Sequence, residues 1–169
     1  MKRTIRPIAI EGKLARIPLT KGHVATIDAA DVPLVEAWNW YALVGEWAVY
    51  AVRGEKIGGK WRSIRLHRVI MSPPDGIEVD HISGDGLDNR RANMRQATTA
   101  QNQHNQRTRR DNTSGFKGVS WDRGGQKWQA HIKINGKSFK LGCHDTPESA
   151  HDAYAEASAR LHGDFGRVI

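Results

Sequence analysis

The apolar residues of this 169-residue chain occur in short runs separated by glycine-containing turns. Short runs in which apolar and polar residues alternate are typical of half-buried β-strands. The turns include Lys21-Gly22, Gly58-Gly59 and Asn135-Gly136, and Asn-Gly is a strong hairpin signal. We therefore expect strands at 15–19, 23–27, 40–43, 47–52, 61–66, 77–82, 116–121, 128–133 and 138–141.

Helices are expected between and after these strands, which makes the chain α+β. Their N-terminal caps would be Asp31, then Thr98 or Thr99, and finally Thr146. Proline follows Thr146 at the first helical position, where its missing amide hydrogen costs nothing, and Gly163 would end this last helix. The apolar face of the last helix consists of Ala150, Ala153, Tyr154, Ala157 and Leu161.

The charge balance points to a polyanionic partner. The chain carries 26 lysine and arginine residues against 18 aspartate and glutamate residues, a net charge of +8. Nucleic acid is the commonest partner for such a surplus, with a merely solvated basic surface as the alternative. Arginines gather in mid-chain, where their planar groups suit phosphate oxygens: Arg90, Arg91, Arg95, Arg107, Arg109 and Arg110.

Other classes of protein are disfavoured. No apolar run approaches the length of a membrane span, and the basic N-terminus lacks the apolar stretch of a signal peptide. Cys143 is the only cysteine, so neither an internal disulfide nor a cysteine zinc cage can form. We expect a cytoplasmic protein with no membrane partner.

The adjacent residues Asp80 and His81 suggest hydrolytic chemistry on a phosphodiester. That reaction needs a base for the attacking water and a cation for the phosphate and the leaving oxygen. A hard divalent cation prefers carboxylate and amide oxygens as ligands. Neighbouring side chains on a strand point to opposite faces, so Asp80 could face a metal while His81 faces the substrate.

Six stretches occur in a fixed order between residues 64 and 105: Leu66-His67-Arg68, Val79-Asp80-His81-Ile82, Gly84-Asp85, Leu87-Asp88-Asn89-Arg90-Arg91, Asn93-Met94-Arg95 and Gln101-Asn102. This series resembles the HNH endonucleases of phages and mobile introns. The resemblance implies a ββα-metal core and products with 5′-phosphate and 3′-hydroxyl ends.

The resemblance also implies a role for each matching residue. His81 matches the general base and Asp80 a metal ligand. Asn102 matches the second protein ligand, where many relatives have histidine, and this favours Mg²⁺ or Mn²⁺ over zinc. Asn93 matches the asparagine that ties the loop between the two strands and orients the base. His67 and Asn105 are candidates for supporting the site, although for His67 a packed core histidine is the favoured interpretation.

The C-terminal part resembles a second family, the ethylene-response-factor (Apetala) type of DNA-binding domain. The matching stretches are Phe116-Lys117-Gly118-Val119, Lys127 to Lys133, Leu141-Gly142, Thr146 to Ala150, Asp152-Ala153-Tyr154 and Leu161-His162-Gly163. The resemblance implies a three-stranded antiparallel sheet packed on one helix, with the open face of the sheet in the major groove of DNA.

The alternation within these strands agrees with that arrangement. Trp128, Ala130 and Ile132 would face the helix, as would Phe139 and Leu141 on the last strand. The expected DNA contacts are Lys117, Ser120, His131, Lys133 and Lys140, with Trp121 and Arg123 as further candidates. Positions that hold arginine or tryptophan in the plant proteins are Ser120, Ser138 and Lys140 here, so the plant target sequence does not carry over.

The sequence therefore predicts a small β-rich region at 1–63, a nuclease core at 64–106, a basic linker at 107–114 and a DNA-binding domain at 115–169. The linker either lies along the DNA backbone or is a solvated hinge. The predicted function is that of a homing-type or phage HNH endonuclease, which uses Mg²⁺ or Mn²⁺ and acts on double-stranded DNA in a bacterial host cell. It would act as a monomer or a homodimer. The alternatives are a DNA-binding regulator with a degenerate nuclease centre and a structure-specific nickase.

Overall fold

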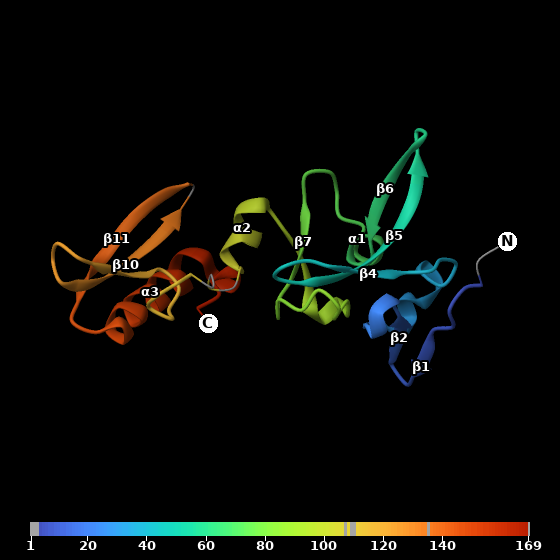
Figure 1. Ribbon diagram of the computed structural model, residues 1–169, viewed down its shortest axis with the longest axis horizontal. Helices are drawn as coiled ribbons and strands as arrows, with labels where there is room; N and C mark the ends of the chain where they lie inside the picture. Colours follow the sequence, from blue (N-terminus) through green and yellow to red (C-terminus); the bar gives the residue numbers. More distant parts are fainter. Residues whose placement is uncertain (1–3, 107, 109–110, 135, 169) are drawn as a thin grey trace. The chain divides into compact units, whose positions relative to one another are not determined.

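The computed structural model describes residues 4–106, 108, 111–134 and 136–168 (Figure 1). Backbone contacts divide the chain into two compact units, Met1–Thr98 and Thr99–Ile169. Among the described residues the first unit contains three small antiparallel sheets and the second contains one, and both units contain helices, so the predicted α+β class is confirmed. No helix among the described residues combines the length and the apolar character needed to cross a membrane.

The first sheet of the first unit has the strand order β1-β2-β3. Its strands are β1 (Ala9–Glu11), β2 (Leu14–Pro18) and β3 (Val24–Asp28). The predicted hairpin between the second and third strands is confirmed, and the 3-10 turn η1 (Thr20–Gly22) joins them.

A short 3-10 helix, η2 (Ala29–Leu34), follows where the sequence predicts a short helix. The predicted cap is wrong, because the cap position is Asp28 and Asp31 lies inside the helix. Asp31 is buried there and its carboxylate pairs with Arg91, 60 residues further along the chain. A partner so distant in sequence leaves no local signal.

The second sheet has the order β4-β5-β6. Its strands are β4 (Tyr41–Val44), β5 (Val49–Ile57) and β6 (Lys60–Arg65). Apolar residues predict β5 only to Val52, yet polar residues continue the strand to Ile57 because they pair with β6. The helix α1 (Leu66–Met71) begins directly after β6, at a position where the sequence pattern predicts only the end of a strand.

The third sheet contains two strands, β7 (Glu78–His81) and β8 (Met94–Ala97). The register places Asp80 opposite Arg95 and His81 opposite Met94. A loop and the 3-10 turn η3 (Arg91–Asn93) connect the two strands.

One hydrophobic core joins all three sheets of the first unit. It runs through the sequence from Ala15 to Met94 and includes the fully buried side chains of Trp40 and Leu66. The indole nitrogen of Trp40 donates a hydrogen bond to the Val35 carbonyl oxygen at 3.0 Å, which satisfies its one polar atom. The region 1–63 and the segment that follows it therefore share a single core.

The second unit contains a sheet with the order β11-β10-β9, packed on a long helix. Its elements are α2 (Thr99–His104), β9 (Val119–Asp122), β10 (Lys127–Ile134), β11 (Lys137–His144), α3 (Pro147–His162) and the 3-10 turn η4 (Gly163–Phe165). The predicted three-stranded sheet on one helix is confirmed.

Gly118, at φ 72°, approaches Tyr154 so closely that a Cβ atom there would lie 2.2 Å from the ring.

The last helix has the predicted cap, because the Thr146 side chain accepts a hydrogen bond from the Ser149 amide at 3.1 Å. Ala150, Tyr154 and Ala157 are buried as expected. One prediction for the apolar face of the helix is wrong, since Leu161 is 45% exposed. Phe139 lies on the predicted face of the sheet but is 49% exposed. Phe139 pairs with the buried Ile132 but lies on the edge strand β11, where no further strand covers it.

Candidate active site

Asp80 and His81 are consecutive on β7 and both side chains are buried. Their partners differ, as alternation along a strand requires. The Asp80 carboxylate accepts a hydrogen bond from Arg95 Nε at 2.8 Å, across the two-stranded sheet. The His81 ring contacts a different set of residues, described next.

A buried hydrogen bond holds the His81 ring. Its Nε2 atom lies 3.3 Å from Oδ1 of Asn89, which is 0% exposed. Asn89 is itself held in place by two hydrogen bonds. Its side-chain nitrogen donates to the Gly86 carbonyl, and its backbone amide donates to the backbone carbonyl of Thr26 on β3 at 2.7 Å. Since an amide oxygen only accepts hydrogen bonds, this arrangement places the ring hydrogen of neutral His81 on Nε2.

Two aromatic rings pack around His81. The His67 ring meets it edge-on at a centroid distance of 5.0 Å, and the Tyr50 ring lies 6.0 Å away. Burial, followed by the charges of His81, Arg65 and Arg68, lowers the pKa of His67 to about 3. His67 is therefore neutral and packed, in direct contact with the predicted base.

The pKa of His81 also lies below its ordinary value of 6.5. Burial is the largest cause, and it is opposed by the Asn89 hydrogen bond and by nearby aspartates, of which Asp80 contributes most. Histidine acts as a base only when neutral, so a lowered pKa keeps His81 competent at neutral pH.

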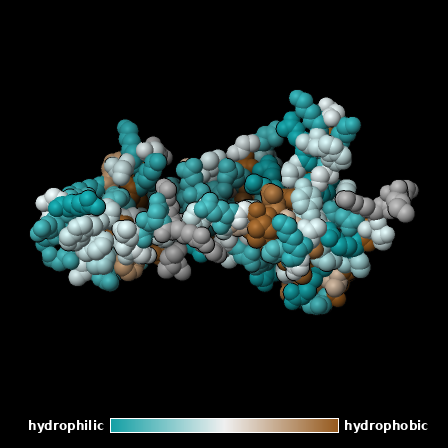
Figure 2. Space-filling view, viewed as in Figure 1, coloured by the Kyte–Doolittle hydropathy of each residue, from teal (hydrophilic) through white to brown (hydrophobic). Residues whose placement is uncertain are grey.

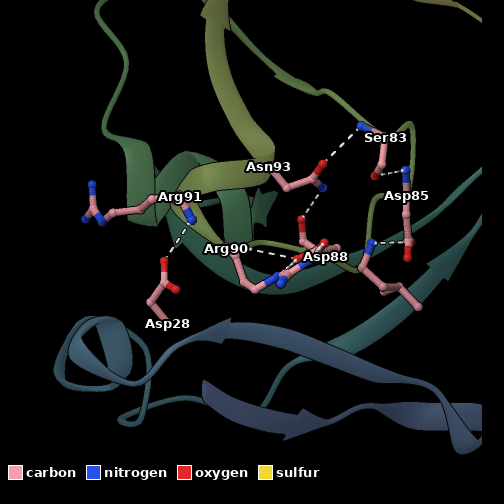
Figure 3. A network of polar contacts seen from close by, with 8 residues as sticks. Asp28, Ser83, Asp85, Asp88, Arg90, Arg91 and Asn93 are labelled. Atoms are coloured by element: carbon pink, nitrogen blue, oxygen red, sulfur yellow. Dashed lines mark hydrogen bonds and ion pairs between the residues drawn. The ribbon is translucent and has the colours of Figure 1, made fainter. Parts of the chain in front are cut away.

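Asn93 closes the loop between β7 and β8 (Figure 3). Its side-chain oxygen accepts a hydrogen bond from the Ser83 amide at 3.0 Å, and its side-chain nitrogen donates to the Asp88 carbonyl at 2.9 Å. Within the loop, Asp85 accepts from the Leu87 amide at 2.9 Å. Asn93 thus ties both ends of the loop.

The same loop lies directly on β5. A Cβ atom at Gly86 would lie 2.5 Å from the Val49 carbonyl and 2.6 Å from the Tyr50 ring, so only glycine fits. On its other side the loop forms a backbone bridge between Asp88 and Thr26 on β3. The loop that carries Asn89 is therefore set by two strands from the N-terminal part of the chain.

The three arginines of this unit that the sequence assigns to phosphate contacts are each paired with a carboxylate. Arg95 binds Asp80, and Arg90 binds the two carboxylate oxygens of Asp88 at 2.7 and 2.6 Å (Figure 3). The guanidinium of Arg90 lowers the pKa of Asp88.

Arg91 holds three segments together. Its guanidinium donates to the buried Asp31 carboxylate at 2.8 Å and to the Ile70 carbonyl at 3.0 Å. Its backbone amide donates to Asp28 at 2.8 Å (Figure 3). Contacts from Arg90, Arg91 and Arg95 to DNA stay predictions, and Arg107, Arg109 and Arg110 lie outside the described residues.

In the second unit, four of the predicted DNA contacts lie on the sheet face away from α3. The strand register pairs His131 with Lys140, and Ser120 Oγ lies 3.5 Å from His131 Nε2. Lys133 and Lys140 are exposed. Lys117 is different, because its Nζ donates to the carbonyls of His104 at 2.5 Å and Gln106 at 2.8 Å.

Two family models match the chain. The HNH endonuclease model matches residues 65–104, and the AP2 domain model matches residues 114–163. Protein 3.8 of Escherichia phage T7 is 34% identical over 107 residues, which cover 63% of this chain and 88% of that protein. The chain belongs to the HNH endonuclease family.

A second relative agrees with this assignment. An uncharacterised HNH endonuclease of Acanthamoeba polyphaga mimivirus is 28% identical over 151 residues, 86% of this chain and 74% of the relative. The order of the two matches, HNH and then AP2, is the predicted order. No solved structure gives a significant match.

The HNH match contains Asp80, His81 and Asn93, together with Asn89, whose contact with His81 is not evident from the sequence. Across the described ranges, no three His, Cys, Asp or Glu side chains are grouped so that they alone could hold a metal ion. Asn102 lies on α2, and Asn105 is buried just after it, both in the second compact unit. Their supporting and metal-binding roles stay predictions.

Proposed function

We propose that this HNH protein is a metal-dependent DNA endonuclease in which His81 is the general base. One observation carries the proposal: a buried, neutral histidine is held by Asn89 immediately beside the buried carboxylate of Asp80. A pre-oriented base next to an oxygen ligand suits hydrolysis of a phosphodiester.

The hydrogen bond to Asn89 determines which ring nitrogen reacts. With its hydrogen on Nε2, neutral His81 takes the proton of the attacking water at Nδ1. The positive charge that then forms on the ring is stabilised by the aspartates around it, of which Asp80 is the strongest. Asn93 keeps the loop closed while this happens.

The donor set suits Mg²⁺ or Mn²⁺. Asp80 supplies one carboxylate, and Mg²⁺ commonly binds one or two carboxylates together with substrate phosphate oxygens. Asn102 is the second ligand that the family resemblance implies. When bound, the ion would stabilise the charge on the phosphate and the leaving 3′ oxygen. Arg95, displaced from part of its pairing with Asp80, would then be available to a phosphate.

The AP2 domain supports double-stranded DNA as the partner, because its exposed sheet face carries Lys133, Lys140 and His131. A sheet edge or ribbon of this width fits the major groove. Both relatives described above are viral proteins, which supports a phage-encoded nuclease that works inside a host cell.

A plasmid assay tests the proposal. Full-length protein is incubated with supercoiled DNA in Mg²⁺, in Mn²⁺ and in EDTA, beside His81→Ala and Asp80→Asn. The expected result is metal-dependent cleavage by the wild type alone. Open circles indicate nicking by one centre, and linear DNA indicates a dimer or two coupled cuts. Intact supercoils in every ion, with DNA binding retained, would favour a DNA-binding regulator instead.

A further inference from the structure

The hairpin formed by β5 and β6 carries an exposed tryptophan, Trp61. Trp61 is 75% exposed, although tryptophan usually buries most of its surface. Figure 1 shows the hairpin extending away from β1 and β2, with Gly58-Gly59 at its tip. The role of this segment is not accounted for by the nuclease centre or by the AP2 domain.

The strand register separates the hairpin into two faces. The pairs Lys56–Trp61, Gly54–Ser63 and Val52–Arg65 alternate with pairs on the other side, so they share one face. The Trp61 ring lies over Gly54, where an added Cβ would be 3.5 Å from the ring. We call this the Trp61 face: Tyr50, Val52, Gly54 and Lys56 of β5, with Trp61, Ser63 and Arg65 of β6.

The Trp61 face begins at the catalytic centre. Tyr50 belongs to it by alternation, and the Tyr50 ring contacts the rings of His67 and His81. The Arg65 guanidinium lies over the Tyr50 ring at 5.1 Å. Val52 is fully buried, so the open part of the face runs from Gly54 to the tip, and Lys56 lies about 20 Å along the strand from Tyr50, the rise of about six base pairs.

The charge of the hairpin is positive. Residues 54–65 contain Lys56, Lys60, Arg62 and Arg65 against the single acid Glu55, which pairs with Arg53 at 3.1 Å. Figure 2 shows a mainly hydrophilic surface over the hairpin, which does not suit an apolar protein partner. Cations interspersed with an exposed aromatic ring suit phosphates together with sugar or base surfaces.

We propose that the β5–β6 hairpin is a DNA-binding arm that holds the duplex beside the cleavage centre, with Trp61 packed against the DNA and Lys56 and Arg65 on its phosphates. The proposal rests on the proposed function in one respect, that the partner is DNA. It adds a second DNA contact, carried by the nuclease unit itself and separate from the AP2 domain.

Binding in EDTA tests the arm without requiring cleavage. Full-length Trp61→Ala/Lys56→Ala, which removes two residues of the Trp61 face, is compared with Trp47→Ala/Lys13→Ala on a fluorescent duplex. The control removes the same two residue types from the same unit, since Trp47 is 55% exposed and Lys13 is exposed. We expect the arm variant to bind at least about five-fold more weakly, with a shallower dependence on salt, and the control to change little.

A crosslinking experiment gives an independent readout, because Cys143 is the only cysteine. In a Cys143→Ser background, Ser63→Cys and Lys13→Cys are each labelled with a photoreactive group and irradiated with the duplex. Ser63, on the Trp61 face, should crosslink and Lys13 should not.

The outcomes separate the two proposals. Equal binding by the arm and control variants, or crosslinking no better from Ser63 than from Lys13, overturns the arm. Wild type that binds and crosslinks as expected but does not cut leaves the arm standing and overturns the nuclease. Wild type that binds no duplex overturns both.

Discussion

The Nε2 atom of His81 lies 3.3 Å from the amide oxygen of Asn89, so the proposed base and its orienting residue are joined inside the protein. Asn89→Ala should lower the cleavage rate about 10- to 100-fold, as loss of an orienting partner does elsewhere, with the DNA Kd unchanged. Single-turnover cleavage and duplex binding measure the two effects.

Asn89→Asp places a negative charge beside the His81 ring and should raise its pKa. The acid limb of the pH–rate profile should therefore move to higher pH from its wild-type position below pH 6.5. If Asn89→Ala cleaved DNA at the wild-type rate, Asn89 would have no part in orienting the base.

His67 should make the fold sensitive to acid. Its pKa is about 3 in the folded chain and 6.5 as an ordinary value, so unfolding takes up a proton between these limits. His67 therefore costs no stability above pH 6.5. As the pH drops towards 3, it lowers the free energy of unfolding by up to about 1.4 kcal/mol per pH unit. Urea unfolding at several pH values should show a flatter acid limb for His67→Phe, which keeps the aromatic contacts. An unchanged limb would assign the acid sensitivity to other groups.

The pair between Asp80 and Arg95 should link metal binding to stability. Arg95→Ala leaves the buried Asp80 carboxylate without this cation and should cost about 3 kcal/mol in the absence of metal. Added Mg²⁺ should then raise the Tm of Arg95→Ala more than that of the wild type, because the ion replaces the lost charge. Asp80→Asn/Arg95→Ala is the control and should not respond to Mg²⁺. A response of the double variant equal to that of Arg95→Ala would place the ion elsewhere.

Arg90 and Arg91 are neighbours that should differ when removed. Arg91→Ala leaves the buried Asp31 unpaired and should destabilise the first unit by about 3 kcal/mol. Arg90→Ala breaks a pair whose aspartate, Asp88, is 18% exposed against 5% for Asp31, and it should lower the Tm much less. Thermal unfolding of both variants checks this contrast, and similar Tm values would show that Asp31 finds another partner.

Replacing Lys117 and replacing Lys140 should have different effects, although the sequence predicts that both lysines contact DNA. Burial lowers the pKa of Lys117 to about 8, and its ammonium group binds two backbone carbonyls near the end of α2. Lys117→Ala should therefore lower the Tm while the salt dependence of DNA binding stays constant. Lys140→Ala should keep the Tm and reduce the slope of log Kd against log salt by about one. If Lys117→Ala also reduced the slope of log Kd against log salt, Lys117 would contact DNA after all.

Local rules account for much of the fold. The turn at Lys21-Gly22 and the cap and proline at Thr146-Pro147 act over a few residues, so the sequence is enough to predict the elements they bound. The failures have tertiary causes. The local sequence predicts a cap at Asp31 because its partner Arg91 is distant, and it predicts too short a β5 because the last residues of this strand are held by pairing with β6 and not by burial.

The site divides in the same way. Asp80, His81 and Asn93 were recognisable because the motif fixes their order along the chain. Asn89 lay inside the motif, yet its contact with His81 depends on β3, which anchors the loop from far upstream. Tyr50 carried no signal at all, because its place beside His81 arises from the packing of β5 against that loop.

The fit of Gly86 against β5 determines where this protein can be divided. Because β3 and β5 contact the loop between β7 and β8, a fragment that starts at residue 64 would keep every motif residue and lose the surface against which this loop packs. Chimaeras made by exchanging the motif alone should misfold. The better junction for domain exchange is the boundary between the two compact units, at Thr98 and Thr99, and the exchanged second half would include the position of Asn102.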